Sequence, residues 1–447
     1  MNQPMLDAIE FLLDTATDKN LDAEVLAFKR SSTAISFQQR KLDQFSLSDT
    51  QQIGVRVLDG KHEGVAFSES LDSSSLEDML TAAHENARAI EKEWVSELRG
   101  EQKLPAMDSL FNPALLDVTT EQKITAAEKL ESSALDFSPE IQSVAYSRYA
   151  DATATAWIAN TKGLRGTYKN NYCMAYASCL AKDGAGAVMD GEVEMGRDFG
   201  KLNTAAIAKM AAEKTLKRRG ATRPKTGTYT IVFENRAAES LLGLITGYFS
   251  AKAVDENRSP LKGKLNTPLF AKALTLTDDP FLTDAGGSRP FDEEGYASQK
   301  TTLVENGLIK NFLTNSVLAR KMKLPHTANA SRAPSTDLDV SATNIVVAPG
   351  KQAFVDLVNA DAKVIVISNM LGFAGFRGAS GDFSIPMEGS LYENGRWSVP
   401  LKDFLISGNI LQLLGNVEAV GNDVRKPIGG VISPSLLVRG LNVAGQS

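Results

Sequence analysis

The sequence predicts an α+β protein: an N-terminal domain of mixed α/β structure, followed by a mostly antiparallel C-terminal β domain that could close into a barrel with a packed helix. In the first half, segments with a 3.6-residue hydrophobic period alternate with strands. In the second half, short strands joined by tight turns predominate. The chain has 447 residues, which is too long for a single ordinary hydrophobic core and predicts two or three domains. Its 43% hydrophobic content is typical of a globular protein.

The N-terminal part begins with a predicted helix at residues 4–19, and a second helix is predicted at residues 75–94. Both place apolar side chains on one helical face, and Ser75 with Asp78 is the expected capping pair of the second helix. Between the helices, residues 53–67 alternate apolar and polar side chains around an Asp-Gly turn, which predicts a β-hairpin. The order of elements is therefore α-β-β-α.

The middle of the chain continues with a helix near residues 120–135, strands around 154–158 and 168–180, and an alanine-rich helix at about 203–218. The cations at the end of this last helix, within residues 214–225, complement its dipole, and the Gly and Pro that follow cannot continue it. A nucleic-acid patch is the alternative interpretation, but no aromatic residues interleave these charges. We place the main domain boundary here. The three predicted domains are residues 1–100, 101–222 and 226–447.

The second half is rich in strands and turns. Residues 301–313 and 390–399 each have Asn-Gly between two short strand patterns, which predicts two hairpins. A helix from about residue 236 to 250 is expected to lie against the sheet. Further short strands are predicted at residues 229–233, 364–367 and 436–438.

Composition narrows the classes of function. With 48 basic and 54 acidic side chains, the formal charge of -6 provides no global field that would attract nucleic acid or an anionic membrane. The sequence has no apolar run of the roughly 20 residues that span a bilayer, and its acidic first thirty residues do not resemble a signal peptide, so we expect a cytoplasmic protein. The two cysteines, Cys173 and Cys179, fit a reducing compartment and are expected to be buried.

The familiar catalytic motifs are incomplete. His84-Glu85 begins a zinc-binding helix pattern, but Arg88 stands where the second histidine is needed. Ser380 lies in a glycine-rich loop, yet the G-x-S-x-G elbow fails because residue 382 is Asp, and His326 is the only histidine in this half of the chain. A turn-forming loop and a surface histidine are therefore the simpler interpretations.

Two acidic clusters, Asp278-Asp279 and Asp292-Glu293-Glu294, could bind a hard cation. They lack the spacing of an EF-hand and are followed by Pro280 and Gly295, as turns are, so solvated loops are predicted instead. The sequence also lacks a phosphate-binding loop and a dinucleotide fingerprint, which leaves nucleotide-dependent chemistry unsupported.

Several motifs, in the right order, resemble those of the TldD/PmbA family, and the resemblance extends across nearly the whole chain. Early matches are the strands around Ala23-Glu24-Val25 and Gly54-Val55-Arg56-Val57, and Asn160-Thr161-Lys162-Gly163 follows them. The second half adds Arg289 to Gly295, Val304 to Ile309, Gly381 to Ser384, Glu393 to Gly395, Ile406 to Asn409, Val420 to Asp423 and the final Ala444 to Gln446.

The resemblance implies a cytosolic two-subunit metalloprotease that acts on small or unfolded peptides. In that family a TldD-type subunit holds zinc with H-E-x-x-x-H and a cysteine, and a PmbA-type subunit, also called TldE, assembles with it. The motif positions fall here on Leu241, Leu242 and Thr246, which cannot build a tetrahedral zinc site. The cysteine expected shortly after Val420 to Asp423 is also missing. By its residues, the chain resembles the PmbA-type partner.

We therefore predict a zinc-free subunit that holds an extended peptide by strand addition, with the zinc on a TldD-type partner and no cofactor on this chain. The assembly would be a heterodimer with that partner, or a homodimer. Whether the chain has activity by itself stays open. The glycine-rich loop is the predicted peptide-binding site, through Gly378, Ser380, Gly381, Asp382 and Phe383.

Two other hypotheses remain. The chain could be a stand-alone homodimeric hydrolase that uses carboxylates or Ser380. It could also be a non-enzymatic regulatory protein linked to DNA gyrase or to toxin systems, for which the basic residues 214–225 are the only support in the sequence.

Overall fold

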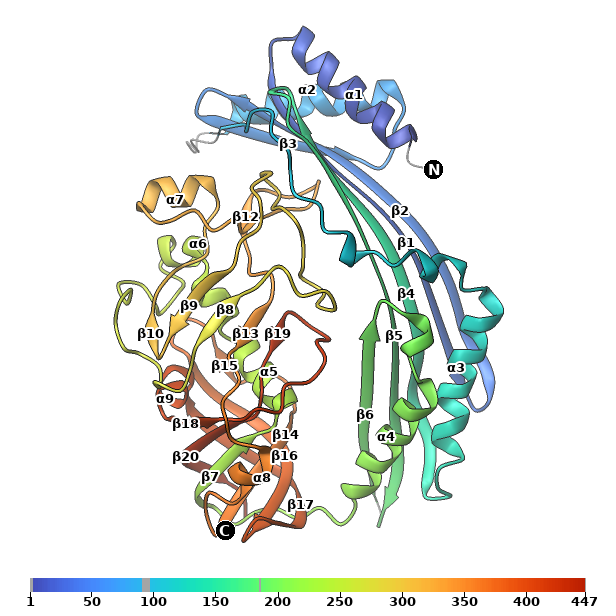
Figure 1. Ribbon diagram of the computed structural model, residues 1–447, viewed down its shortest axis with the longest axis vertical. Coiled ribbons are helices and arrows are strands. Elements are labelled where there is room, and N and C mark those ends of the chain that lie inside the picture. Colours follow the sequence, from blue (N-terminus) through green and yellow to red (C-terminus); the bar gives the residue numbers. More distant parts are fainter. Residues whose placement is uncertain (1–2, 91–96, 185, 447) are drawn as a thin grey trace.

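The computed structural model describes residues 3–90, 97–184 and 186–446. Figure 1 shows an N-terminal lobe built on a long curved sheet and a C-terminal lobe built on shorter strands. The α+β fold class is confirmed, with a half-barrel in the first lobe and a closed barrel in the second. No helix in the described part of the chain is both long and apolar enough to cross a membrane.

The N-terminal lobe has one antiparallel sheet in the order β3-β2-β1-β4-β5-β6. Its elements are α1 (Gln3–Asp18), β1 (Asp22–Gln38), β2 (Lys41–Asp59), β3 (His62–Ser68), α2 (Ser73–Ala89), α3 (Thr120–Leu135), β4 (Ile141–Asn160), β5 (Arg165–Asp183), β6 (Gly186–Gly196) and α4 (Thr204–Lys217). Because β1 pairs with β4 from Glu24 and Asn160 to Ser36 and Arg148, the first two predicted domains share this single sheet.

Two pairs of helices cover the same face of the long sheet at its two ends. Odd-numbered side chains of β1 lie on this face, and Val25 packs near α1 and α2, whereas Ile35 packs in a cluster with residues of α3. The opposite face carries Leu26 and packs against Phe291 of the C-terminal lobe. Around Val25 and Leu26, one face of the sheet is therefore covered by helices and the other by the C-terminal lobe.

The helix prediction for residues 75–94 needs two corrections. The cap of α2 is Asp72, whose side chain accepts from the Ser75 amide, and not the pair Ser75 and Asp78. The helix ends at Ala89, and residues 91–94 lie outside the described residues. The long strands were also underestimated, because residues 41–50 of β2 are mostly exposed and show no hydrophobic alternation.

The C-terminal lobe contains a barrel that closes when β14 pairs with β16, giving the ring β14-β7-β20-β17-β16. A second sheet, β10-β9-β8-β13-β19, shares the barrel's hydrophobic core. The strands are β7 (Gly227–Phe233), β8 (Leu276–Asp278), β9 (Thr301–Glu305), β10 (Leu308–Ile309), β11 (Ala330–Ser331), β12 (Asp339–Val340), β13 (Ile345–Val347), β14 (Lys363–Met370), β15 (Phe376–Arg377), β16 (Asp382–Glu393), β17 (Arg396–Asn409), β18 (Val417–Val420), β19 (Val431–Ile432) and β20 (Leu436–Ala444).

The helices of this lobe are short: α5 (Asn235–Gly243), α6 (Ala251–Asp255), α7 (Ser316–Met322), α8 (Phe354–Val358) and α9 (Ile410–Gly415). The predicted helix at 236–250 is therefore too long. The α-helix ends at Gly243, and a separate 3-10 turn covers Thr246–Phe249.

The two lobes contact each other through a buried set of charges that we call the interlobe lock: Glu24, Arg56, Glu63 and Arg332. Glu24 accepts from Arg332 at 2.7 Å and from Arg56 at 2.9 Å, and both arginine side chains are at most 1% exposed. Arg332 belongs to the C-terminal lobe, so it links that lobe to the long sheet. Beside it, β2 passes so close to the other lobe that a Cβ on Gly54 would lie 2.2 Å from the carbonyl oxygen of Pro334.

Candidate functional site

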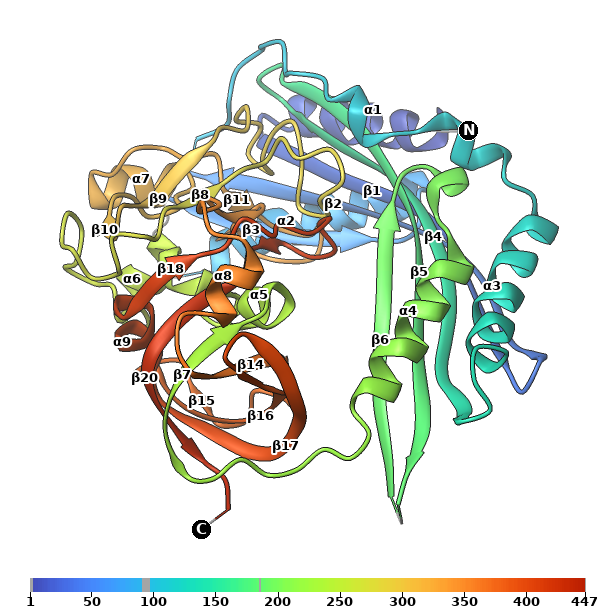
Figure 2. The same cartoon turned by 60° about the horizontal axis from the view of Figure 1, so that its bottom comes forward.

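The free edge of β6 lies along a cleft between the two lobes. β6 is the last strand of the long sheet, so no strand of this chain pairs with its outer edge in the described residues. Figure 2 shows this strand facing the C-terminal barrel. Three pockets, of about 560, 310 and 370 Å³, follow the cleft, and residues of β6 line all of them. A peptide in this cleft could reach both the strand edge and the barrel.

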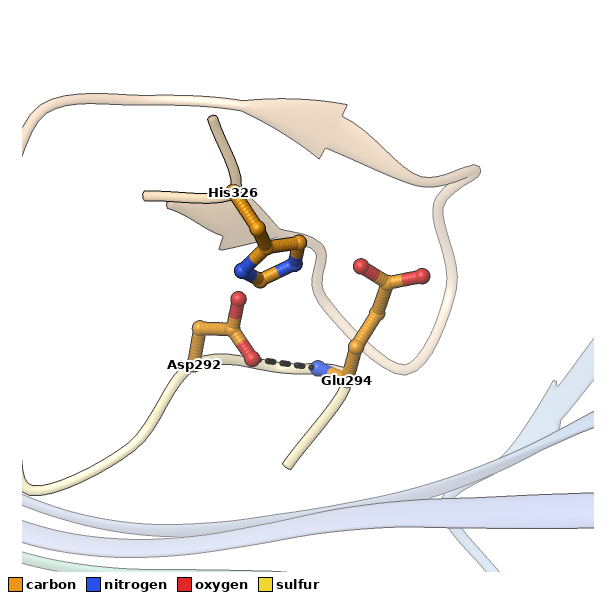
Figure 3. Close-up of side chains that lie close together, drawn as sticks. All are labelled: Asp292, Glu294 and His326. Carbon is orange, nitrogen blue, oxygen red and sulfur yellow. Dashed lines mark hydrogen bonds between the residues drawn. The ribbon is translucent and has the colours of Figure 1, made fainter. Parts of the chain in front are cut away.

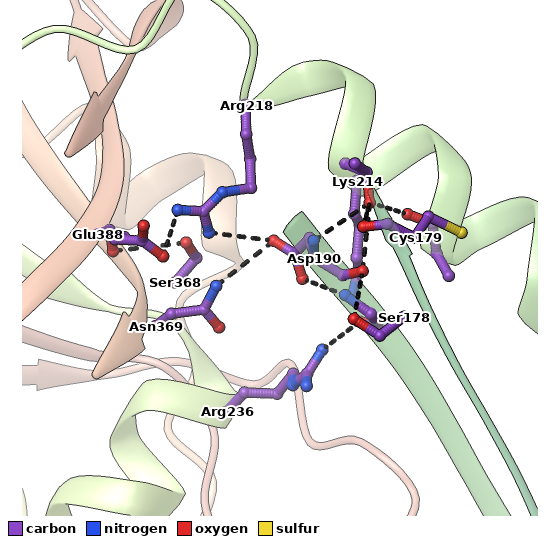
Figure 4. Close-up of polar contacts among 12 residues, drawn as sticks. Ser178, Cys179, Asp190, Lys214, Arg218, Arg236, Ser368, Asn369 and Glu388 are labelled. Carbon is purple, nitrogen blue, oxygen red and sulfur yellow. Dashed lines mark hydrogen bonds and ion pairs between the residues drawn. The ribbon is translucent and has the colours of Figure 1, made fainter. Parts of the chain in front are cut away.

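Side chains cover part of this strand edge. The Gly191 amide donates to the carboxylate of the preceding residue, Asp190, at 2.7 Å, and the Val193 amide donates to Glu192 in the same way at 3.0 Å. From the other lobe, Arg236 donates to the Gly191 carbonyl at 2.9 Å (Figure 4). These are side-chain partners, which a peptide backbone could replace without breaking the sheet.

Ion pairs cross the cleft beside the strand edge. Arg218, at the end of α4, contacts Asp190 of β6 at 3.2 Å and also contacts Glu388 of β16 (Figure 4). Lys214 pairs with Glu192 at 2.5 Å. The basic segment that suggested nucleic-acid binding is thus largely engaged with carboxylates, since Arg219 also pairs with Glu140.

Helix α5 presents its polar face to the cleft. Arg236, Glu239 and Ser240 line the 370 Å³ pocket, and their spacing of three and four residues places them on one side of the helix. Burial raises the pKa of Glu239 to about 6, and the nearby Arg425 opposes that shift. Glu234, just before the helix, also has a raised pKa because it is buried. The charges of Glu234 and Glu239 are therefore only weakly compensated by nearby cations.

Models of three domains match the chain: PmbA/TldA metallopeptidase domain 1 at residues 23–87, the central domain at 113–219 and the C-terminal domain at 226–445. The chain belongs to the PmbA/TldA metallopeptidase family.

Relatives in the family match over nearly their whole length. An uncharacterized protein of Methanocaldococcus jannaschii is 27% identical, with 97% of this chain and 99% of the relative covered. Metalloprotease PmbA of Escherichia coli O157:H7 is 23% identical, covering 98% and 96%. The similarity to metalloprotease PmbA supports a peptidase-related function.

Solved structures of similar proteins have the same fold. A Thermotoga maritima protein, named for a modulator of DNA gyrase, superposes with a TM-score of 0.91 at 26% identity, covering 98% of this chain and 100% of that one. TldE from Thermococcus kodakarensis superposes with a TM-score of 0.88 at 20% identity, covering 98% and 100%. At 20% identity the second match speaks for the fold alone.

The family description implies a metal ion, and the side chains of α5 do not fit the zinc that the sequence resemblance predicts for the family. Leu241 and Leu242, where the motif was placed, are at most 1% exposed and belong to the hydrophobic core, on the other side of the helix from the cleft. The hydroxyl of Thr246 donates to the Gly243 carbonyl at 3.2 Å. On the cleft side, Arg236 and Arg425 have no lone pair for a metal and repel a cation.

The glycine-rich loop predicted to bind peptide lies between β15 and β16, outside the linings of the three cleft pockets. Ser380 donates to Asp382 at 2.7 Å, and hydrogen bonds from Asn409 and Ser380 lower the pKa of Asp382. Gly378 is exposed, whereas Gly381, at a φ of +81°, is buried. Phe383 is 4% exposed in the barrel core and is unavailable to a ligand, so that part of the prediction is corrected.

The acidic clusters predicted to be solvated are in fact buried. Asp278 is 0% exposed and accepts from Thr343 and Asn329. Asp292 and Glu294 are at most 3% exposed and lie near His326 (Figure 3). The prediction failed because buried loops also carry carboxylates when backbone amides satisfy them.

Asp292, Glu294 and His326 form the one group of three potential metal ligands found among the described residues, with ligand atoms within 4.8 Å of one another. Each carboxylate is already held by amides: Asp292 accepts from Glu294 and Tyr296, and Glu294 accepts from Ser316. His326 accepts from the Ala328 amide through Nδ1, and a metal-binding histidine ordinarily donates from its second nitrogen. These contacts indicate a structural role in holding loops together.

Sequence reasoning missed β6, Arg236, Glu239 and Arg425. A signal for the helix was present, because Arg236, Glu239 and Ser240 alternate with alanines and leucines at a helical period. Nothing local marks Arg425, which lies in a loop and meets α5 only through the fold.

Proposed function

We propose that the chain is the zinc-free, PmbA/TldE-type subunit of a two-subunit peptidase in which a TldD-type partner carries the zinc. The observation that carries this proposal is the set of α5 side chains that line the cleft. They are an arginine, a glutamate and a serine (Arg236, Glu239 and Ser240), and none of them is a histidine. A subunit with such a cleft can bind a peptide but lacks the Lewis acid that activates water in this family. The partner would supply that chemistry, in the cytoplasm, to small or unfolded peptides.

The role of this chain would be to hold an extended peptide along β6. A peptide that adds to a sheet edge binds through backbone groups and therefore makes little demand on sequence. The Gly191 and Val193 amides are the groups that would bind it, since side chains alone occupy them. The pockets beside them have room for side chains that alternate along the peptide.

The test of this function is reconstitution. The purified chain, a histidine-bearing TldD-type homologue and their mixture are assayed on an unstructured nine-residue peptide of glycine, serine and alanine, and zinc is measured on each separated protein. We expect the mixture to cleave with zinc on the homologue only. Stoichiometric zinc on this chain, or cleavage by this chain alone that a chelator stops, would rule the proposal out and favour a stand-alone homodimeric hydrolase.

A matched pair of variants tests the strand edge. Val193→Pro removes the amide that a peptide would bind, whereas Val193→Ala keeps it, and proline is tolerated on edge strands where the N–H faces outward. We expect the proline variant to bind the same peptide about tenfold more weakly. One backbone hydrogen bond is lost, and the proline ring obstructs the approach of the peptide. Equal binding by both variants would place the peptide elsewhere.

The DNA-linked hypothesis gains no support from the geometry. Within the basic segment, Lys214, Arg218 and Arg219 pair with carboxylates of β6, β16 and the loop before β4. Paired cations release few counterions from DNA, so we propose no nucleic-acid function.

A further inference from the structure

Arg425 is a largely buried cation without a good partner. It lies in the loop between β18 and β19, and its side chain is 18% exposed. The nearest carboxylate oxygen, on Glu239, is 3.6 Å away, whereas charge-assisted hydrogen bonds are usually about 2.7–2.9 Å long. None of its guanidinium donors makes a hydrogen bond to another residue in the described part of the chain. Arg425 lines both the 310 Å³ and the 370 Å³ pockets, so a ligand in the cleft can reach these donors.

A second arginine faces the same space. Arg236 lines both the 310 Å³ and the 370 Å³ pockets together with Arg425, and it lies 3.9 Å from Glu192. Burial lowers the pKa of Arg425, and the charge of the nearby Arg236 guanidinium lowers it further. The neighbouring lysines are already taken, since Lys214 pairs with Glu192 and Lys426 pairs with Glu194. The unengaged donors at this end of the cleft therefore belong chiefly to Arg425.

We propose that Arg425, with Arg236 beside it, binds a carboxylate of the peptide held along β6. The planar fork of a guanidinium matches the two oxygens of a carboxylate, which is the anion that peptides carry. The site lies beside the strand edge, because Val193 of β6 lines both pockets with the two arginines. This subsite rests on the proposed function and would anchor one end or one acidic side chain of a peptide that is otherwise bound by its backbone.

Glu239 acts as an internal competitor in this arrangement. Its carboxylate is the only one within ion-pair distance of Arg425 among the described residues, and one of its oxygens is buried without a hydrogen-bond partner. A bound peptide carboxylate would replace this weak contact. Removing the competitor by Glu239→Gln should therefore strengthen carboxylate binding, by roughly two- to tenfold.

The carboxylate could be the C-terminus of the peptide or an acidic side chain, and four probes separate these sources. Each is a dansyl-labelled nine-residue peptide of glycine, serine and alanine: one with a free C-terminus, one amidated, one amidated with an internal Glu, and one amidated with Gln at that position. Binding to the full-length chain is measured by fluorescence anisotropy. Tighter binding of the free terminus, or of the Glu peptide, over its neutral counterpart is the expected result and identifies the source.

Variants then assign the effect to Arg425. We expect Arg425→Gln to weaken binding of the favoured carboxylate peptide by roughly ten- to hundredfold and to leave the amidated peptide unchanged. Arg425→Lys keeps the charge but loses the fork, so it should restore only part of the affinity. Arg439→Gln is the matched control, because that arginine pairs with Glu418 and Asp361 away from the cleft pockets.

A small ligand tests the subsite without relying on strand addition. N-acetyl-alanyl-alanine is compared with its C-terminal amide in a thermal shift of the full-length chain and of Arg425→Gln. If N-acetyl-alanyl-alanine, but not its amide, stabilises the unaltered chain, and neither stabilises Arg425→Gln, the subsite is supported even when longer peptides do not add to β6. If the nine-residue peptides bind with no dependence on carboxylate or on Arg425, the subsite is wrong and strand addition stands. If neither kind of ligand binds, both are wrong.

Discussion

The interlobe lock and the Arg425–Glu239 pair in the cleft are built from the same residue types and differ in how well those residues are matched. In the interlobe lock, Arg332 lies 2.7 Å from Glu24 and both side chains are at most 1% exposed. In the cleft, Arg425 lies 3.6 Å from Glu239, and the two are 18% and 15% exposed. One arginine is held at hydrogen-bond distance, and the other is not.

This difference separates structure from binding. Breaking a buried, hydrogen-bonded pair leaves an uncompensated charge, so the lock fixes how the lobes sit against each other. In the cleft, the contact between Arg425 and Glu239 is loose enough that Arg425 can exchange Glu239 for a ligand, as a binding site requires. An Arg–Glu pair thus fixes the positions of the lobes in the interlobe lock, whereas the Arg–Glu pair in the cleft leaves guanidinium donors without a hydrogen bond.

The largest expected effect comes from the lock. Arg332→Ala should lower the free energy of unfolding by about 3–5 kcal/mol, because Glu24 would stay buried with one of its two arginine partners gone. Urea denaturation at neutral pH measures this loss, and Arg439→Gln, at an exposed pair, should have little effect. A loss no larger than that of the control would show that the lock does not hold the lobes.

The close approach of the lobes beside the lock gives the next effect. Gly54→Ala places a Cβ 2.2 Å from the Pro334 carbonyl oxygen, and since that atom is backbone, the lobes must shift apart. We expect a loss of about 1–3 kcal/mol in unfolding free energy, the usual range for overpacking. Gly196→Ala is the matched control, because a Cβ there meets nothing within 4 Å. Equal stability of the two variants would mean that the lobes can move apart at Gly54 with little loss of unfolding free energy.

The cleft should give the smallest effect on stability, and it should depend on pH. The pKa of Glu239 is raised by burial to about 6 in the folded chain, so the folded state binds this proton more tightly than the unfolded state. Stability from this group is fully present below its ordinary pKa and is lost as pH rises to about 6. Glu239→Gln should remove about 1–2 kcal/mol of this dependence between pH 4 and 7.

Chemical denaturation of both proteins at each pH measures the difference. Arg425, Arg236 and the Ser433 amide all act on this carboxyl and favour its charged form, so the folded-state pKa stays below what burial alone would give. Parallel stability curves for the variant and the unaltered chain would contradict the assignment of this proton to Glu239.

Patterns along the chain predicted the fold class, the hairpins and the capped helix before the linker, because these depend on local periodicity and turn residues. The ends of the long strands were not predictable, since residues 41–50 are solvent-exposed on both faces and carry no hydrophobic period. The family motifs predicted a subunit without zinc ligands, yet they placed the vacant motif on Leu241 and Leu242, which face the core.

The rest depends on contacts between distant segments. Arg425 and Glu239 are 186 residues apart, and the free edge of β6 becomes a binding surface only when the barrel stands opposite it. Likewise, Asp292 looked like a turn residue but is buried because the loop packs under a second lobe. Such sites can be identified only from the three-dimensional structure, because no local sequence pattern marks them.

Hydrogen exchange tests the central claim most directly, because it reports which backbone amides a peptide covers. The full-length chain is exchanged with and without the nine-residue peptide that has a free C-terminus, and protection is compared for residues 186–196 and 376–383. Binding along the cleft predicts slower exchange across β6, with the glycine-rich loop unchanged. Protection confined to residues 376–383, or an unchanged β6 under conditions where the peptide is bound, would contradict it.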